Sequence, residues 1–116
     1  MVTPDSEKRE TPEYSLERVR DLAERGSVQF AGSRVFRDVE NLGYAPENVH
    51  DCLRKLDKQH FRHSIWYSKT KSWNDVYRLS FMAPSGDVDH LYIKLKLNRD
   101  CVVVVLQSFH RDRDNG

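Results

Sequence analysis

The chain has 116 residues, of which 38% are hydrophobic and 32% are charged, and its formal net charge is +1. This length suits one small domain, and no run approaches the roughly 18 apolar residues that a membrane span needs. The start, MVTPDSEKRE, has no apolar stretch, so we expect no signal peptide and a cytoplasmic location. Cys52 and Cys101 form no CxxC spacing and are interpreted as free thiols in a reducing compartment.

The small net charge conceals a difference between the two halves of the chain. Residues 1–57 contain 9 Lys and Arg against 12 Asp and Glu, whereas residues 58–116 contain 10 against 6. Four of the five histidines also lie in the second half. A basic half favours a polyanionic partner, although an excess of this size is weak support by itself.

Residues 1–13 are charged, contain two prolines and show no hydrophobic period. This composition predicts a disordered N-terminal tail. A single domain is then expected over residues 14–110, followed by a short C-terminal tail over residues 111–116.

Three helices are predicted by apolar residues that recur at helical spacing. The first lies in YSLERVRDLAERG, with Ser15 as N-cap and Gly26 as the stop, and a short edge strand, SVQF, follows it. The second helix lies in SRVFRDVENLG, and the third begins at Pro46 in PENVHDCLRKL. The residues expected to face the core are Leu16, Val19, Leu22, Ala23, Val35, Phe36, Val39, Leu42, Val49, Leu53 and Leu56.

After Asp57 the hydrophobic period changes from helical to alternating, which predicts strands. Four strands are expected, in HFRHSIWYS, WNDVYRLSFM, HLYIKLKLN and CVVVVLQSF. The short turns PSGD and NRD make neighbouring strands antiparallel. CVVVVL is apolar on both faces, which predicts a central strand covered on both sides. The fold class is therefore α+β, with N-terminal helices packed on one face of a mostly antiparallel sheet.

Apolar and polar residues alternate within HLYIKLKLN, which gives the predicted strand an apolar face and a basic face. Leu91, Ile93, Leu95 and Leu97 share one face, which we expect the helices to cover. Burying the more apolar set of WNDVYRLSFM likewise leaves its polar set on the opposite face, with His63 near that surface and His110 just beyond the last strand. The polar residues predicted there are His63, Asn74, Arg78, Tyr92, Lys94, Lys96 and His110.

By pattern alone, such a polar face is more often a solvated surface than a site. The histidines form no HxH, HxxxH or HExxH spacing, so no metal is expected, and no phosphate-binding glycine loop suggests a nucleotide cofactor. The residues of this polar face are therefore compatible only with chemistry that needs neither a metal nor a cofactor. RNA cleavage by its own 2′-hydroxyl is such a reaction, because it needs only a base, an acid and cations around phosphorus.

Three segments, in order and with short gaps, resemble the MqsR family of toxins. They are YSLERVRDLAERGSVQF, FRHSIWYSKTKSWNDVYR and LYIKLKLNRDCVVVVLQSF, and the resemblance runs from about residue 12 to residue 110. The most specific piece is WNDVYR, which is similar to the family's W-Q-D-V-Y-R. LYIKL is similar to the family's V-Y-L-K-I, and QSFH to its V-S-F-K.

This resemblance implies a RelE-like fold and an mRNA-cleaving endoribonuclease of a bacterial type II toxin–antitoxin system. It further implies cleavage at short GC-containing sites and inhibition by a cognate antitoxin similar to MqsA. Whether the ribosome takes part stays open. An alternative class is an RNA- or ribosome-binding module without cleavage activity, and a third is a purely protein-binding domain.

The family's proposed active positions fall on His63, Asn74, Tyr92 and His110. Tyr92 is unchanged, whereas the family has glutamine at Asn74 and lysine at both histidines. An imidazole has an unperturbed pKa of about 6.5 against about 10.4 for lysine, which suits proton transfer near neutral pH. The resulting hypothesis makes the two histidines an acid–base pair, assisted by Tyr92 and Asn74. In the same hypothesis, phosphate charge is bound by Arg78, Lys94 and Lys96.

Overall fold

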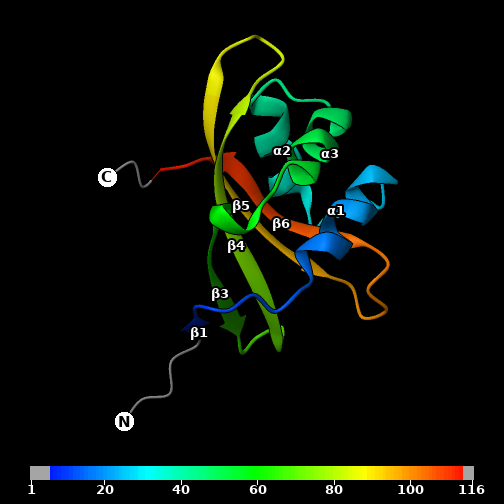
Figure 1. Ribbon diagram of the computed structural model, residues 1–116, viewed down its shortest axis with the longest axis vertical. Helices are drawn as coiled ribbons and strands as arrows, with labels where there is room; N and C mark the ends of the chain where they lie inside the picture. Colours follow the sequence, from blue (N-terminus) through cyan, green and yellow to red (C-terminus); the bar gives the residue numbers. More distant parts are fainter. Residues whose placement is uncertain (1–5, 114–116) are drawn as a thin grey trace.

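The computed structural model describes residues 6–113, and in them three helices pack on one face of a six-stranded sheet (Figure 1). The strands lie in the order β1-β3-β4-β5-β6-β2, and only the β2–β6 pair is parallel. The predicted α+β class is therefore confirmed. The helices are α1 (Leu16–Glu24), α2 (Ser33–Asn41) and α3 (Pro46–Arg54), with a 3-10 turn at Lys58–His60. The strands are β1 (Ser6–Arg9), β2 (Val28–Phe30), β3 (Phe61–Tyr67), β4 (Ser72–Met82), β5 (Val88–Leu97) and β6 (Val104–Arg111).

The helix boundaries follow the predicted local signals. Ser15 is the N-cap of α1, where its Oγ accepts a hydrogen bond from the Arg18 N–H at 3.2 Å. Gly26 has a φ of 72° just after that helix, a left-handed conformation that favours glycine. Pro46 is the first residue of α3, where a missing N–H has no cost.

The core lies between the helices and the apolar face of the central strands. Leu91, Ile93 and Leu95 of β5 are fully buried, as the alternating pattern predicts. Phe36 was also expected to face inward, but its side chain is 48% exposed. It packs at the surface against Phe30 of β2, with the ring centroids 6.0 Å apart. Phe36 remains partly exposed because α2 lies near the edge of the sheet rather than over its centre. The helical period of the sequence does not distinguish these two positions.

The last strand differs most from its prediction. β6 begins at Val104 rather than at Cys101, because the Asn98 carboxamide oxygen accepts the N–H groups of Val102 and Val103 and holds them in the turn. The strand lies between β5 and the edge strand β2, and the described helices all lie on one side of the sheet. β6 is therefore an interior strand of the sheet, but the expectation that it is covered on both faces is wrong. His110, which was expected beyond the strand, lies within it.

The predicted disordered tail is wrong for the part that the structure describes. Residues 6–9 form β1, which pairs antiparallel with β3 and satisfies the backbone groups of that edge. The Arg9 guanidinium lies 4.0 Å from the centroid of the Trp73 ring, a cation–π contact that local sequence patterns do not reveal. Residues 1–5, and residues 114–116 of the predicted C-terminal tail, lie outside the described residues.

Asp75 of β4 anchors the segment between β1 and α1. Its fully buried carboxylate accepts the backbone N–H groups of Glu13 and Tyr14, each at 3.0 Å. Burial raises the pKa of this carboxyl, and the two N–H donors oppose that rise. We expect Asp75→Ala to reduce the free energy of unfolding by roughly 2–4 kcal/mol, because two partly buried backbone N–H groups lose their acceptor.

Urea unfolding followed by circular dichroism measures this loss of stability. The matched control is Asp87→Ala, which removes an exposed carboxylate from the turn between β4 and β5. Equal unfolding midpoints for the two variants would contradict the anchoring role of Asp75.

Candidate active site

The sheet surface opposite the helices, called here the open face, carries Asn74, Arg78, Tyr92, Lys94, Lys96 and His110. Within it, Tyr92 of β5 has Arg78 of β4 as its partner on one side and His110 of β6 on the other. Direct cross-strand partners point to the same face, so these three side chains form one row. The predicted placement of Arg78 beside Tyr92 is confirmed.

Tyr92 and His110 are stacked, with ring centroids 5.1 Å apart and an interplanar angle of 10°. The Nδ1 atom of His110 lies 2.8 Å from the carbonyl oxygen of Arg111. A carbonyl oxygen can only accept, so in the neutral ring Nδ1 carries the proton and Nε2 is the free acceptor. A ring held in one orientation with an available acceptor nitrogen has the form of a general base.

The environment of Tyr92 keeps its phenol protonated. Burial raises the pKa of Tyr92 above its ordinary value of 10.0, and the nearby Tyr67 and Asp112 act in the same direction. Lys94 and Arg78 oppose this rise. The phenol therefore retains its proton at neutral pH and can donate a hydrogen bond or a proton.

Two cations are held close to this pair. The Arg78 guanidinium carbon lies 5.7 Å from the centroid of the Tyr92 ring, and its Nε lies 3.3 Å from a carboxylate oxygen of Asp112. Lys94 donates a hydrogen bond from Nζ to the hydroxyl of Tyr67 at 2.8 Å. These contacts orient both cations beside Tyr92, as binding of a phosphate group requires.

A hollow of about 520 Å³, called here the Tyr92 hollow, joins these groups. It brings together Arg78, Tyr92, Lys94 and His110, four of the seven predicted residues. Its lining has four basic side chains against two acidic ones, which favours an anionic ligand. The lining residues that sequence analysis missed are Arg34, Val35, Asp38, Gln107, Ser108, Asp112 and Arg113.

Two of the missed residues had no usable sequence signal. Arg34 lies in the first turn of α2, where a polar residue is equally consistent with a solvated helix surface. Asp112 belongs to RDRDNG, whose alternating charges were interpreted as part of a tail. Both enter the hollow only because α2 and the end of β6 lie side by side in the fold.

The structure does not bring His63 and His110 together. His63 of β3 is partnered by Val76 of β4, and three strand spacings, about 14 Å, separate it from β6. His110 lines the Tyr92 hollow, whereas His63 is not among its lining residues. Burial, followed by the charges of Lys8 and Arg78, lowers the pKa of His63 below 6.5, which favours its neutral form.

His63 lies on the open face, as predicted, because its partner Val76 has the same parity in β4 as Asn74 and Arg78. The pairing of β3 with β4 shifts between Phe61 and His63, so the two residues do not share a face. Phe61 instead packs toward the core against Tyr77, with ring centroids 5.6 Å apart. Simple alternation along β3 would place both residues on the same side.

Asn74 and Lys96 lie on the open face but outside the Tyr92 hollow. Asn74 is only 2% exposed, and its Nδ2 donates to the carbonyl oxygen of Ser72 at 3.4 Å. Lys96 is four residues along β5 from Tyr92, which corresponds to about 13 Å. Neither is placed to contact the same atoms as Tyr92 and His110.

Residues 6–113 contain no group of three or more His, Cys, Asp or Glu that could hold a metal ion. No helix in this part of the chain is long and apolar enough to cross a membrane. Cys52 is buried and Cys101 is exposed, and both are free thiols, as predicted.

Residues 11–111 match the model of a protein family described as "Motility quorum-sensing regulator, toxin of MqsA". The chain belongs to the MqsR family of toxins. The resemblance predicted from three sequence segments is thereby confirmed, and the protein is a toxin of a toxin–antitoxin system. Membership of this family implies an antitoxin partner, MqsA. Comparison with curated proteins gave no match.

The family match covers most of the Tyr92 hollow. Tyr92 and His110 both lie inside the matched range, whereas β1, Asp112 and Arg113 lie outside it. The stacked pair is therefore part of the MqsR-family domain, and the Asp112 carboxylate that faces Arg78 follows directly after that range.

Proposed function

We propose that this MqsR-family toxin is a metal-independent endoribonuclease that cleaves mRNA in the cytoplasm and is inhibited by its antitoxin. The observation that carries the proposal is the stacked Tyr92–His110 pair, whose free imidazole nitrogen and protonated phenol lie in one cation-lined hollow. A base, an acid and fixed cations are the groups that RNA cleavage by its own 2′-hydroxyl requires.

In the proposed reaction, His110 Nε2 takes the proton of the 2′-hydroxyl, and the 2′-oxygen attacks the adjacent phosphorus. The bond from phosphorus to the 5′-oxygen breaks, and the Tyr92 hydroxyl gives its proton to that leaving oxygen. The products are a 2′,3′-cyclic phosphate and a 5′-hydroxyl end. Proton exchange through solvent then returns His110 and Tyr92 to their starting states.

Arg78 and Lys94 stabilise the negative charge that develops on the phosphoryl oxygens, since both are held beside Tyr92 before substrate binds. Arg34 adds a third cation at the wall of the hollow. His63 and Lys96 contact the RNA strand away from the reacting phosphate in this proposal, whereas Asn74 is too deeply buried to do so. The acid–base pair is accordingly His110 and Tyr92, rather than the two histidines.

The test is incubation of the purified protein with single-stranded RNA in the presence of EDTA. We expect cleaved fragments that end in 2′,3′-cyclic phosphate, with sequencing of the ends showing short GC-containing sites. Binding that weakens with salt but yields no such ends would instead support the RNA- or ribosome-binding alternative. Comparison of naked RNA with translated RNA measures any need for the ribosome.

A further inference from the structure

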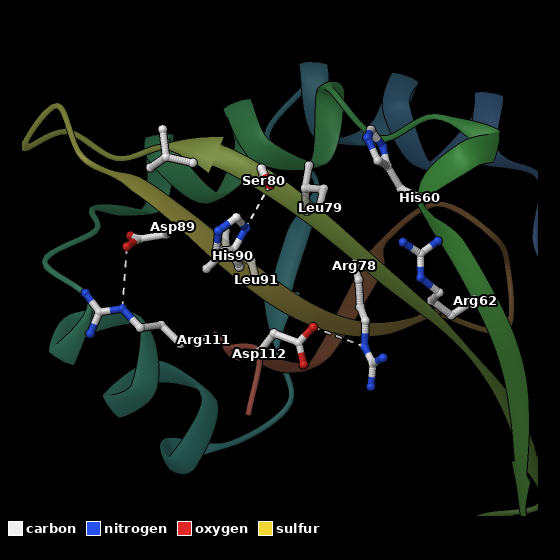
Figure 2. A pocket seen from close by; sticks show the side chains of 11 residues that line it. His60, Arg62, Arg78, Leu79, Ser80, Asp89, His90, Leu91, Arg111 and Asp112 are labelled. Atoms are coloured by element: carbon white, nitrogen blue, oxygen red, sulfur yellow. Dashed lines mark hydrogen bonds and ion pairs between the residues drawn. The ribbon is translucent and has the colours of Figure 1, made fainter. Parts of the chain in front are cut away.

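A second and larger hollow, of about 790 Å³, adjoins the Tyr92 hollow and is called here the His90 hollow (Figure 2). The two hollows share Arg78 and Asp112, so this ion pair lies at the boundary between them. Figure 2 shows His60 and Arg62 on one side of the His90 hollow and the Arg111–Asp89 contact on the other. An elongated ligand held by Arg78 can therefore extend from one hollow into the next.

The strand register places successive rows at regular intervals along the open face. The Ser80–His90 pair lies two residues beyond the Arg78–Tyr92 pair on both strands, a step of about 6.7 Å. This step is close to the distance between neighbouring phosphates in an extended single strand. Two further residues along lie Met82 and Val88, an apolar pair that is 67% and 57% exposed.

The side chains of the His90 hollow suit a nucleotide. His90 Nδ1 lies 2.8 Å from the Ser80 hydroxyl, which orients an exposed imidazole ring that can stack on a base. Arg62 is exposed, and its Nη1 donates to the carbonyl oxygens of Gln59 and Phe61, which orients the guanidinium.

The acidic groups in this lining are already engaged by other side chains. The Asp89 carboxylate accepts the Tyr44 hydroxyl at 2.7 Å and faces Arg111 Nε at 3.4 Å, while Asp112 faces Arg78. Their charges are therefore partly compensated, and Arg62 remains available to an incoming anion. This balance favours a phosphate-bearing ligand over a basic peptide.

We propose that the His90 hollow is a second subsite for single-stranded RNA, in which the Ser80–His90 pair contacts the base next to the scissile phosphate and Arg62 binds a neighbouring phosphate. This inference rests on the proposed ribonuclease function and extends it to substrate selection. The exposed Met82–Val88 pair at the hairpin tip supplies apolar surface for the next base along the strand.

The binding experiment uses Arg62→Ala, His90→Ala and the matched control Arg20→Ala, which removes an exposed arginine of α1 outside both hollows. The probe is a single-stranded RNA that is 2′-O-methylated throughout, so that it cannot be cleaved. We expect Arg62→Ala to raise its Kd about tenfold and to reduce the salt dependence by about one phosphate contact. The control is expected to bind like the wild type, and circular dichroism checks that each variant is folded.

Two further measurements show where the RNA lies on the protein and which nucleotide it places there. Photocrosslinking with thiouridine-substituted RNA is expected to label the segment 82–90. His90→Ala is expected to relax the base preference at one nucleotide beside the cut, measured by sequencing the cleaved ends.

The subsite is refuted if Arg62→Ala and His90→Ala bind the uncleavable RNA as tightly as the wild type. It is also refuted if Arg20→Ala weakens binding as much as Arg62→Ala, since net charge would then be the cause, or if crosslinks fall only outside the hollow. Failure of the proposed function would be recognised differently: RNA incubated with the wild-type protein would carry no 2′,3′-cyclic phosphate ends. Binding of an uncleavable RNA does not depend on that chemistry.

Discussion

His110→Ala is expected to lower the rate of RNA cleavage by about 100- to 10,000-fold, the usual contribution of a positioned general base. The reason is that His110 Nε2 is the free acceptor nitrogen of a ring fixed by its Nδ1 contact to Arg111 and by stacking on Tyr92. Single-turnover cleavage of a labelled RNA measures the chemical step without product release.

The matched control is His50→Ala, which removes a half-buried imidazole from α3, outside both hollows. It should cleave at nearly the wild-type rate, provided that it is folded. If His110→Ala also retains wild-type cleavage while folded, His110 is not the base and the proposed chemistry must be abandoned.

The pH dependence of the wild-type rate distinguishes the two candidate acids. The pKa of Tyr92 is raised above 10.0 by burial, so an acid at Tyr92 keeps its proton and the rate should not decline between pH 7 and about 9. The pKa of His63 is lowered below 6.5, so an acid at His63 would lose its proton and the rate would fall before neutrality. A rate that already declines at or below neutral pH would therefore contradict the assignment of Tyr92.

Arg78→Ala should lower kcat/KM by about 100- to 1,000-fold, the cost of losing one donor aimed at developing charge. Arg78 lines both hollows and lies against Tyr92, so its loss affects both the reacting phosphate and the strand beyond it. The Kd for uncleavable RNA should rise as well. Arg78→Lys should recover part of the activity, because lysine keeps the charge but lacks the two-pronged guanidinium.

A variant of Asp112, the ion-pair partner of Arg78, tests whether Arg78 binds phosphate or only stabilises the fold. Asp112→Asn removes the carboxylate that faces Arg78 and keeps the guanidinium, so RNA binding should become tighter at low salt. If Asp112→Asn instead loses as much activity as Arg78→Ala, Arg78 acts by holding the end of β6 and not by binding phosphate.

Strong local patterns predicted a large part of the fold. The alternation in β5 correctly separated Leu91, Ile93 and Leu95 from Tyr92 and Lys94, because a strand places successive side chains on opposite faces. Ser15, Gly26 and Pro46 correctly marked helix ends, because each has a conformational or hydrogen-bonding property that acts within a few residues. The order of motifs then indicated the MqsR family, which the match over residues 11–111 confirms.

Other features depend on strand pairings between distant parts of the chain. The bulge beside His63, the position of β6 next to an edge strand, and the addition of β1 to the sheet all follow from such pairings. They could not be predicted from the alternating pattern, because one extra residue in a strand reverses every later assignment.

By itself, the sequence determined the α+β class, the toxin family and the faces of β4 and β5, since these follow from local periods and motif order. Only the tertiary structure decided that Tyr92 stacks on His110, that His63 lies three strands away, and that Arg34 and Asp112 join the same hollow. The physical reason is that register and strand order depend on contacts among residues far apart in the chain. A side chain's neighbours across a sheet are therefore not encoded in its own segment.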